Sequence, residues 1–130
     1  MKVVIDTNVI VSALLNANGT PAKIVSLILN GKIKIQYDNR IIFEYNEVLS
    51  RKEFAFDLET VNDLMNYFKH DGEFVNANHL NLAFIDDADK KFYEVYKSAG
   101  AQYLTSGNLK HFPKEKNIIL PKDFLEVYEG

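Results

Sequence analysis

Acidic side chains stand at three points of the chain where a carboxylate could take part in chemistry. Asp6 directly follows the apolar run 3–5, Glu44 lies inside an otherwise apolar helical stretch, and Asp89 falls in the first turn of a predicted helix. A polar segment, residues 105–108, follows another predicted strand. Ligands of open α/β sheets bind outside the carboxyl ends of the strands, so Asp6 and segment 105–108 stand where a site is expected.

The spacing around Glu44 adds a physical reason to expect a ligand. Glu44 comes three residues after Ile41 and four before Val48, which turns its side chain toward the apolar face of the helix. An unpaired carboxylate on such a face costs free energy, and a bound cation would offset that cost. Glu44 could instead point sideways to solvent, with Glu47 as its more exposed neighbour.

Each acid also has an ordinary structural explanation. An acid after a strand, such as Asp6, often only forms a turn or a helix cap. Asp86, Asp87 and Asp89 cluster at a helix start, where acids interact favourably with the helix dipole. The segment 106–108 could be a plain turn. The prediction of a functional site therefore depends on the combination of these residues and not on any one of them.

The elements that would position these residues alternate between strands and helices. The predicted strands are 3–5, 33–37, 74–75, 103–105 and 118–120. The predicted helices run from Thr20 to just before Gly31, from Asp38 or Asn39 to Leu49, from Asp57 to Phe68, from Asp86 or Asp87 to Ala99, and onward from Pro121. The apolar residues that follow Asn8 are assigned to no element.

This alternation predicts an α/β fold, a three-layer sandwich around a mostly parallel central sheet of about five strands. Continuous apolar runs such as 3–5 and 118–120 are typical of parallel strands that are buried on both faces. The chain has 130 residues, of which 47% are hydrophobic, and this predicts a single domain over residues 1–130.

The composition excludes several other kinds of protein. The chain has no cysteine, so disulfides and thiolate metal sites are ruled out. A net charge of −3 argues against a broad basic surface, although a local cluster of Lys and Arg can still bind nucleic acid. No stretch is long and apolar enough to span a bilayer, and Asp6 and Asn8 interrupt the apolar N-terminus, so we expect a cytoplasmic protein.

Three stretches, in this order and at these distances, resemble one known family. They are VIDTNVIVSALL at 4–15, EYNEVLSR at 44–51 and DDADKKFYEVYKSAGAQYLTSGNLKHFP at 86–113, and they resemble the PIN-domain family. The resemblance covers nearly the whole chain, down to ILPKDFLEVY at 119–128. It is greatest to the small bacterial PIN proteins of toxin–antitoxin pairs, related to the VapC type. DTN alone would be weak support, whereas the ordered set is specific.

The resemblance implies four residues that are catalytic and hold the metal: Asp6, Glu44, Asp89 and Asn108. Asp6 matches the first acid of the family, Glu44 the helical Glu, and Asp89 the acid that opens the helix before the fourth strand. Asn108 matches a position where many members carry Asp, so one negative charge is missing in this chain.

The same resemblance implies a PIN-like domain that is a metal-dependent endoribonuclease with Mg²⁺ or Mn²⁺ as cofactor. Water would attack an RNA phosphate in line, the 3′-oxygen would leave, and the products would carry a 5′-phosphate. Thr7 is expected to hydrogen-bond within the site and Asn8 to brace the strand end. As a toxin the protein would have an antitoxin partner, and like many PIN proteins it would form a homodimer.

Other interpretations of strand-end acids fit less well. A phosphatase of the haloacid-dehalogenase type needs a second acid two residues after the first, where this chain has Asn8. A receiver domain needs an acidic pair near the first strand, and this chain has none there. A nucleotide-binding module would need a glycine-rich phosphate loop, which is absent from this sequence. The open alternative is a catalytically weak or inactive PIN scaffold that binds protein or nucleic acid, for which Asn108 leaves room.

Three basic residues near these acids are assigned to the surface. Lys90 and Lys91 directly follow Asp89, and His111 follows Asn108 by three residues. Either lysine could contact the RNA backbone and His111 could touch a phosphate, but a solvated position is the simpler prediction for each.

Overall fold

The strands form one parallel sheet in the order β3-β2-β1-β4-β5 in the computed structural model, which describes residues 1–130. The strands are β1 Lys2–Ile5, β2 Lys34–Tyr37, β3 Glu73–Phe74, β4 Tyr103–Thr105 and β5 Ile118–Ile119. Every neighbouring pair is parallel. The predicted α/β fold class is therefore confirmed, with a sheet that is parallel throughout.

Six α-helices and three short 3₁₀ turns connect or flank these strands. The α-helices are α1 Thr7–Leu15, α2 Thr20–Leu29, α3 Asn39–Leu49, α4 Leu58–Asp71, α5 Lys90–Ala99 and α6 Pro121–Glu129. The 3₁₀ turns are η1 Lys52–Phe54, η2 Asp87–Asp89 and η3 Leu109–His111. None of the helices combines the length and apolar character needed to cross a membrane.

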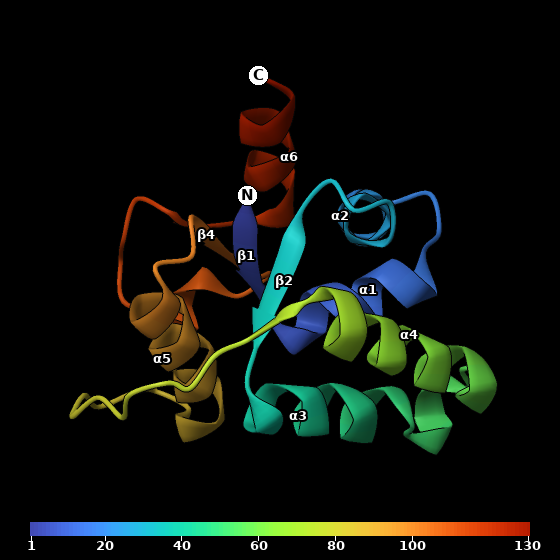
Figure 1. Ribbon diagram of the computed structural model, residues 1–130, viewed down its shortest axis with the longest axis horizontal. Helices are drawn as coiled ribbons and strands as arrows, with labels where there is room; N and C mark the ends of the chain where they lie inside the picture. Colours follow the sequence, from blue (N-terminus) through green and yellow to red (C-terminus); the bar gives the residue numbers. More distant parts are fainter.

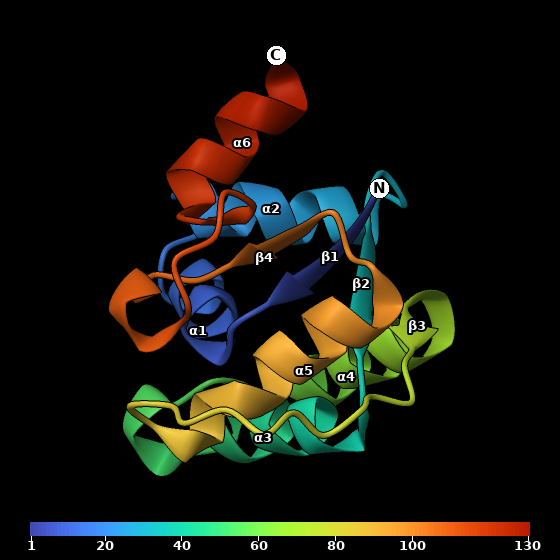
Figure 2. The same cartoon turned by 90° about the vertical axis from the view of Figure 1, so that its left-hand side faces the viewer.

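Helices cover both faces of the sheet and make three layers. Figure 1 shows α5 on one side of β1 and β2, with α1, α2 and α4 on the other side. Figure 2, in which α5 lies in front of the strands, shows β1 leading into α1 and β2 leading into α3 at the lower edge. This edge is the carboxyl end of the sheet, where the sequence predicts the functional site.

The central strand β1 and three aromatic side chains form the middle of the core. Val3, Val4 and Ile5 expose no surface, as expected for a parallel strand with a helix layer on each face. Tyr45 of α3 packs against Phe68 of α4 and Phe92 of α5, with ring centroids 5.9 and 6.3 Å apart. Aromatic packing of this kind fixes α3 against two other helices, and thereby fixes the neighbour of Tyr45, Glu44.

The helix α1 was not predicted from the sequence. Its residues Val9, Ile10 and Val11 are β-branched and have low helix propensity, and only Asp6 separates the end of β1 from the start of the helix. The helix forms nevertheless because it buries Val9, Ile10 and Ala13. Burial of one face in the core outweighs the intrinsic preference of these residues.

The starts of the other helices agree with the sequence prediction to within a few residues. The side chain of Asp38 accepts a hydrogen bond from the Ile41 amide at 3.0 Å and so caps α3. Gly19, and not Thr20 as predicted, stands at the cap position of α2. Asp86, one of two predicted caps, accepts from the Ala88 amide at 3.0 Å and starts η2, after which α5 begins at Lys90.

Gly72, which links α4 to β3, occupies a place with no room for a side chain. A Cβ atom at this position would lie 2.3 Å from the carbonyl oxygen of Phe68 and 2.8 Å from that of Ile35. Both are backbone atoms of regular elements, so neither can move aside cheaply. Gly72→Ala is expected to lower the free energy of unfolding by about 1–3 kcal/mol, measured by urea denaturation.

The matched control for this prediction is Gly107→Ala. A Cβ atom at Gly107 would meet no atom closer than Asn8 Oδ1 at 3.7 Å, an ordinary contact distance. The control is therefore expected to unfold at nearly the wild-type urea concentration. An equal loss of stability in the two variants would contradict the steric explanation.

Candidate active site

Asp6 is held at the carboxyl end of the central strand by its backbone. Its amide donates to the carbonyl oxygen of Thr105 in β4 at 3.0 Å, and its carbonyl oxygen accepts from the Val9 amide in the first turn of α1 at 3.0 Å. Both backbone groups are thus used by the strand-to-helix junction. The side chain makes no cap hydrogen bond to the helix and is free to take part in a site.

The Asp6 carboxylate is buried, and its surroundings favour the protonated form. The residue is 5% exposed, and Ser106 Oγ donates to Asp6 Oδ2 at 2.7 Å. Burial, with a smaller contribution from the negative charges of Asp89 and Glu44, outweighs the lowering effect of the Ser106 hydrogen bond and raises the pKa of Asp6 to about 6. Three acids from distant parts of the sequence therefore act on one another.

Glu44 is positioned on α3 by contacts with the end of β1 and the start of α1. The Tyr45 hydroxyl donates to the carbonyl oxygen of Ile5, and the Thr7 hydroxyl donates to Glu44 Oε2. The predicted hydrogen bond of Thr7 within the site is therefore present. Glu44 is half-buried and paired, so the free-energy cost predicted for an unpaired carboxylate at this position is already offset within the chain.

The partner of Glu44 is Lys91 in the first turn of α5. Its Nζ donates to Glu44 Oε1 at 2.6 Å and also to the carbonyl oxygen of Ala88. The side chain is only 12% exposed, and its ammonium lies 5.0 Å from the ring centroid of Phe92. Lys91 is therefore part of the site and not, as predicted, of a solvated helix face.

Asp89 and Asn108 meet through His111. His111 Nδ1 lies 2.8 Å from Asp89 Oδ2, and Asn108 Nδ2 lies 3.1 Å from His111 Nε2. Burial is the largest cause of a raised pKa of Asp89, which the hydrogen bond from His111 counteracts. His111 is 33% exposed, so it lies partly at the surface as predicted, and its ring also contacts two of the predicted site residues, Asp89 and Asn108.

The turn 106–108 links Asn108 back to Asp6. The Asn108 amide donates to Ser106 Oγ at 2.9 Å, the same hydroxyl that donates to Asp6. The Gly107 amide donates to Asn8 Oδ1 at 3.2 Å, so Asn8 braces the strand end as predicted. The sequence predicts Ser106 only as part of a turn, and its position two residues before Asn108 is the feature that could have indicated a role in the site.

The four predicted residues thus belong to one connected set at the carboxyl edge of the sheet. With the side chains as they stand, no three His, Asp or Glu side chains are close enough together to hold a metal ion. The chemistry of the donor set still fits a hard cation, since it offers carboxylate oxygens and one amide oxygen. A buried acid with a raised pKa, beside two further acids, is a group that a cation would stabilise.

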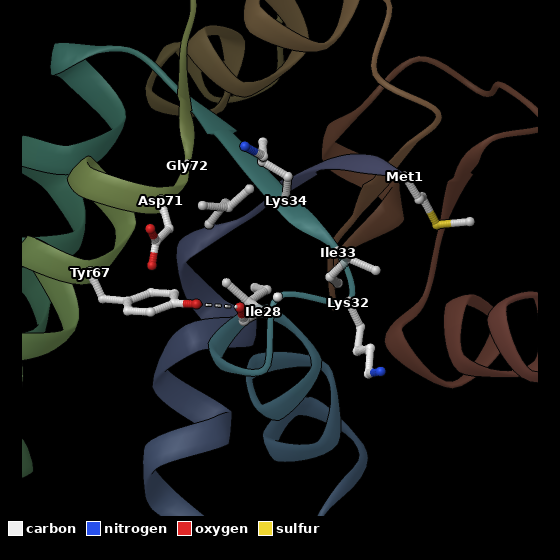
Figure 3. A pocket seen from close by; sticks show the side chains of 10 residues that line it. Met1, Ile28, Lys32, Ile33, Lys34, Tyr67, Asp71 and Gly72 are labelled. Carbon is white, nitrogen blue, oxygen red and sulfur yellow. Dashed lines mark hydrogen bonds between the residues drawn. The ribbon is translucent and has the colours of Figure 1, made fainter.

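Two cavities open at the surface, one away from the predicted site residues and one beside Glu44. One, of about 390 Å³, lies at the amino ends of β1 and β2 near Lys34, where the Tyr67 hydroxyl donates to the Ile28 carbonyl at 3.0 Å (Figure 3). It includes none of the four site residues. The other, of about 500 Å³, opens beside Glu44 and is lined by Asn39, Arg40, Phe43, Glu44, Glu47 and Lys91. Of the four predicted site residues only Glu44 lines the second cavity, which gives a ligand access to the site from the side of Glu44.

Comparison with known proteins finds a family model and a relative that match this chain over most of its length. A family model described as PIN domain matches residues 2–110, a range that includes all four predicted site residues. An uncharacterized protein of Methanocaldococcus jannaschii is 32% identical over 143 residues, which cover 99% of this chain and 92% of that protein. No solved structure matches the chain.

The raised pKa of Asp6 makes the stability of the fold depend on pH. The folded state holds this proton more tightly than the unfolded chain, whose carboxyl has its usual pKa of 3.8. Stability is therefore lost as the pH rises from about 4 through about 6, and the full cost of the charged carboxylate is present above that range. Asp6→Asn is expected to raise the free energy of unfolding by about 2–3 kcal/mol at pH 7.5.

Urea denaturation in EDTA at pH 7.5 and pH 4 measures this effect. The gain is expected to vanish near pH 4, where the wild-type carboxyl is itself mostly neutral in the folded state. Asp63→Asn, the same substitution at an exposed acid of α4, is the control and should show no such pH dependence. Destabilisation by Asp6→Asn at pH 7.5 would contradict the explanation.

Proposed function

The chain belongs to the PIN-domain family, and on that premise we propose that it is an endoribonuclease that depends on a divalent metal. PIN domains are generally nucleases, so the family indicates hydrolysis of nucleic acid as the broad activity. The observation that supports the finer proposal most is the Asp6 carboxylate, whose pKa is raised first by burial and then by the charges of Asp89 and Glu44. Perturbed acids of this kind cluster at functional sites.

Asp6, Glu44 and Asp89 would hold Mg²⁺ or Mn²⁺, and the amide oxygen of Asn108 would supply a further ligand. When bound, such a cation relieves repulsion among the acids, lowers the pKa of water and stabilises charge on a phosphate. The protein's own contribution is to fix the acids. Tyr45 and Thr7 hold Glu44 against β1, and the 106–108 turn holds Asp6.

The cavity beside Glu44 would receive the substrate. Arg40 and Lys91 line it, together with the exposed ring of Phe43. Cations offset the charge of a nucleic-acid backbone, and an aromatic face can stack on an unpaired base. No residue of the cavity identifies a contact with a 2′-hydroxyl group. The preference for RNA over DNA is therefore supported only by the resemblance to the small bacterial PIN proteins.

Asn108 favours a second candidate, a PIN scaffold that is catalytically weak or inactive and binds protein or nucleic acid. In this chain an amide stands where many family members carry an acid, which reduces the charge available to a cation. Calorimetry with Mg²⁺ and Mn²⁺ separates the two candidates. Binding at or below millimolar concentrations favours the nuclease, and no binding favours the scaffold.

Asp6→Asn is expected to abolish metal-dependent cleavage of a single-stranded RNA, a loss of at least about a hundredfold, because the variant keeps the shape of the site but lacks the charge. Cleavage in Mn²⁺ is followed on a denaturing gel with a 5′-labelled RNA. Asp63→Asn, an exposed acid of α4, is the matched control and should cleave at the wild-type rate. Full activity of Asp6→Asn would refute the assignment of Asp6 as a metal ligand. If urea denaturation shows that the variant is more stable than the wild type, loss of folding cannot explain a lower activity.

The toxin role in a toxin–antitoxin pair extends this proposal and is supported by the resemblance of the motifs alone. Induced expression of the wild-type chain in bacteria is expected to stop growth, whereas the Asp6→Asn chain is expected to leave it unchanged. The measurement is the growth curve after induction. An antitoxin would be identified as a co-expressed protein that restores growth. Growth arrest by both chains, or by neither, would contradict the toxin role.

A further inference from the structure

We propose that Lys91 is an internal counter-ion that competes with a divalent metal for Glu44 and thereby sets the metal affinity of the site. The inference rests on the proposed function, because it assumes that the acids bind a metal. It assigns a role to a residue that is neither an acid nor a metal ligand.

The contacts of Lys91 place a positive charge on the acid set from within the chain. Its Nζ lies 2.6 Å from Glu44 Oε1, while Thr7 donates to the other oxygen of the same carboxylate. Both oxygens of Glu44 therefore already have a donor. A metal ion that takes Glu44 as a ligand meets the repulsion of this ammonium and competes with it for the charge of the carboxylate.

The pair also connects the helix of Glu44 to the segment of Asp89. Glu44 lies on α3, and Lys91, at the start of α5, follows Asp89 of η2 by two residues. The second hydrogen bond of Lys91, to the Ala88 carbonyl, turns the ammonium back toward η2. The pair therefore keeps Glu44 beside the other acids when no metal is present, although like charges repel.

Competition follows from the limited exposure of the pair. Lys91 is 12% exposed and Glu44 25%, so water screens the pair less than it screens an ion pair on the open surface. If Glu44 is released from Lys91 for only about one tenth of the time, the apparent metal affinity falls about tenfold below the intrinsic value. Removal of the ammonium should restore the intrinsic affinity.

The test is calorimetric titration of the full chain with Mn²⁺ at constant ionic strength. Lys91→Met, which keeps the aliphatic length of the side chain, is expected to bind Mn²⁺ about tenfold more tightly than the wild type. Lys91→Arg keeps the charge and is expected to stay within about twofold of it. Lys90→Met removes the same charge from the neighbouring residue, which makes no salt bridge, and is expected to leave the affinity unchanged.

A second measurement covers the possibility that Lys91→Met folds poorly. In EDTA its midpoint of thermal unfolding is expected to fall, and added Mn²⁺ is expected to raise that midpoint by more than it does in the wild type. Lys91→Gln, which keeps a donor for the Ala88 carbonyl, should behave in the same way. Equal or weaker Mn²⁺ binding by both variants overturns the role of Lys91 while the nuclease proposal stands. Failure of the wild type and all variants to bind Mn²⁺ overturns both.

Discussion

The burial of one negative charge, that of Asp6, is the constraint on which the rest of the site depends. Asp6 ends the central strand, so the sheet and the helix layers remove its carboxylate from water. Desolvation of a carboxylate costs several kcal/mol unless other groups replace the lost water. The Ser106 hydroxyl and the Thr7 amide replace part of it, yet the pKa of Asp6 stays near 6. The free-energy cost that remains when Asp6 is ionised does not stabilise the fold, so we infer that the buried carboxylate serves to bind a ligand.

The other two acids show a different solution to the same problem. Glu44 has the ammonium of Lys91 and the hydroxyl of Thr7, and Asp89 has the ring of His111. Asp6 alone has only uncharged donors. A cation at this edge of the sheet would therefore stabilise Asp6 most, whereas at Glu44 it would have to replace a charge that is already present.

Sequence patterns predicted the elements whose signals are local, and missed those set by distant contacts. The cap at Asp38 or Asn39 and the parallel character of the sheet were predictable from turn chemistry and from the alternation of strands and helices, whereas the order of the strands was not predicted. The helix α1 was not, because its β-branched residues become helical only when the core buries them. The pairing of Lys91 with Glu44 spans 47 positions, and no spacing rule connects residues on two different helices. His111 was seen near the site but its bond to Asp89 depends on how η3 folds back onto η2.

The same charge balance explains why an amide at position 108 suits this chain. The Asn108 side chain contacts His111, which also contacts Asp89, and its backbone amide donates to the hydroxyl that holds Asp6. A carboxylate there would add a fourth negative charge near two acids whose pKa values are already raised. A further like charge raises such pKa values still more, which disfavours the ionised form of these acids. An amide keeps an oxygen ligand at the edge of the sheet and leaves Asp6 and Asp89 better able to ionise.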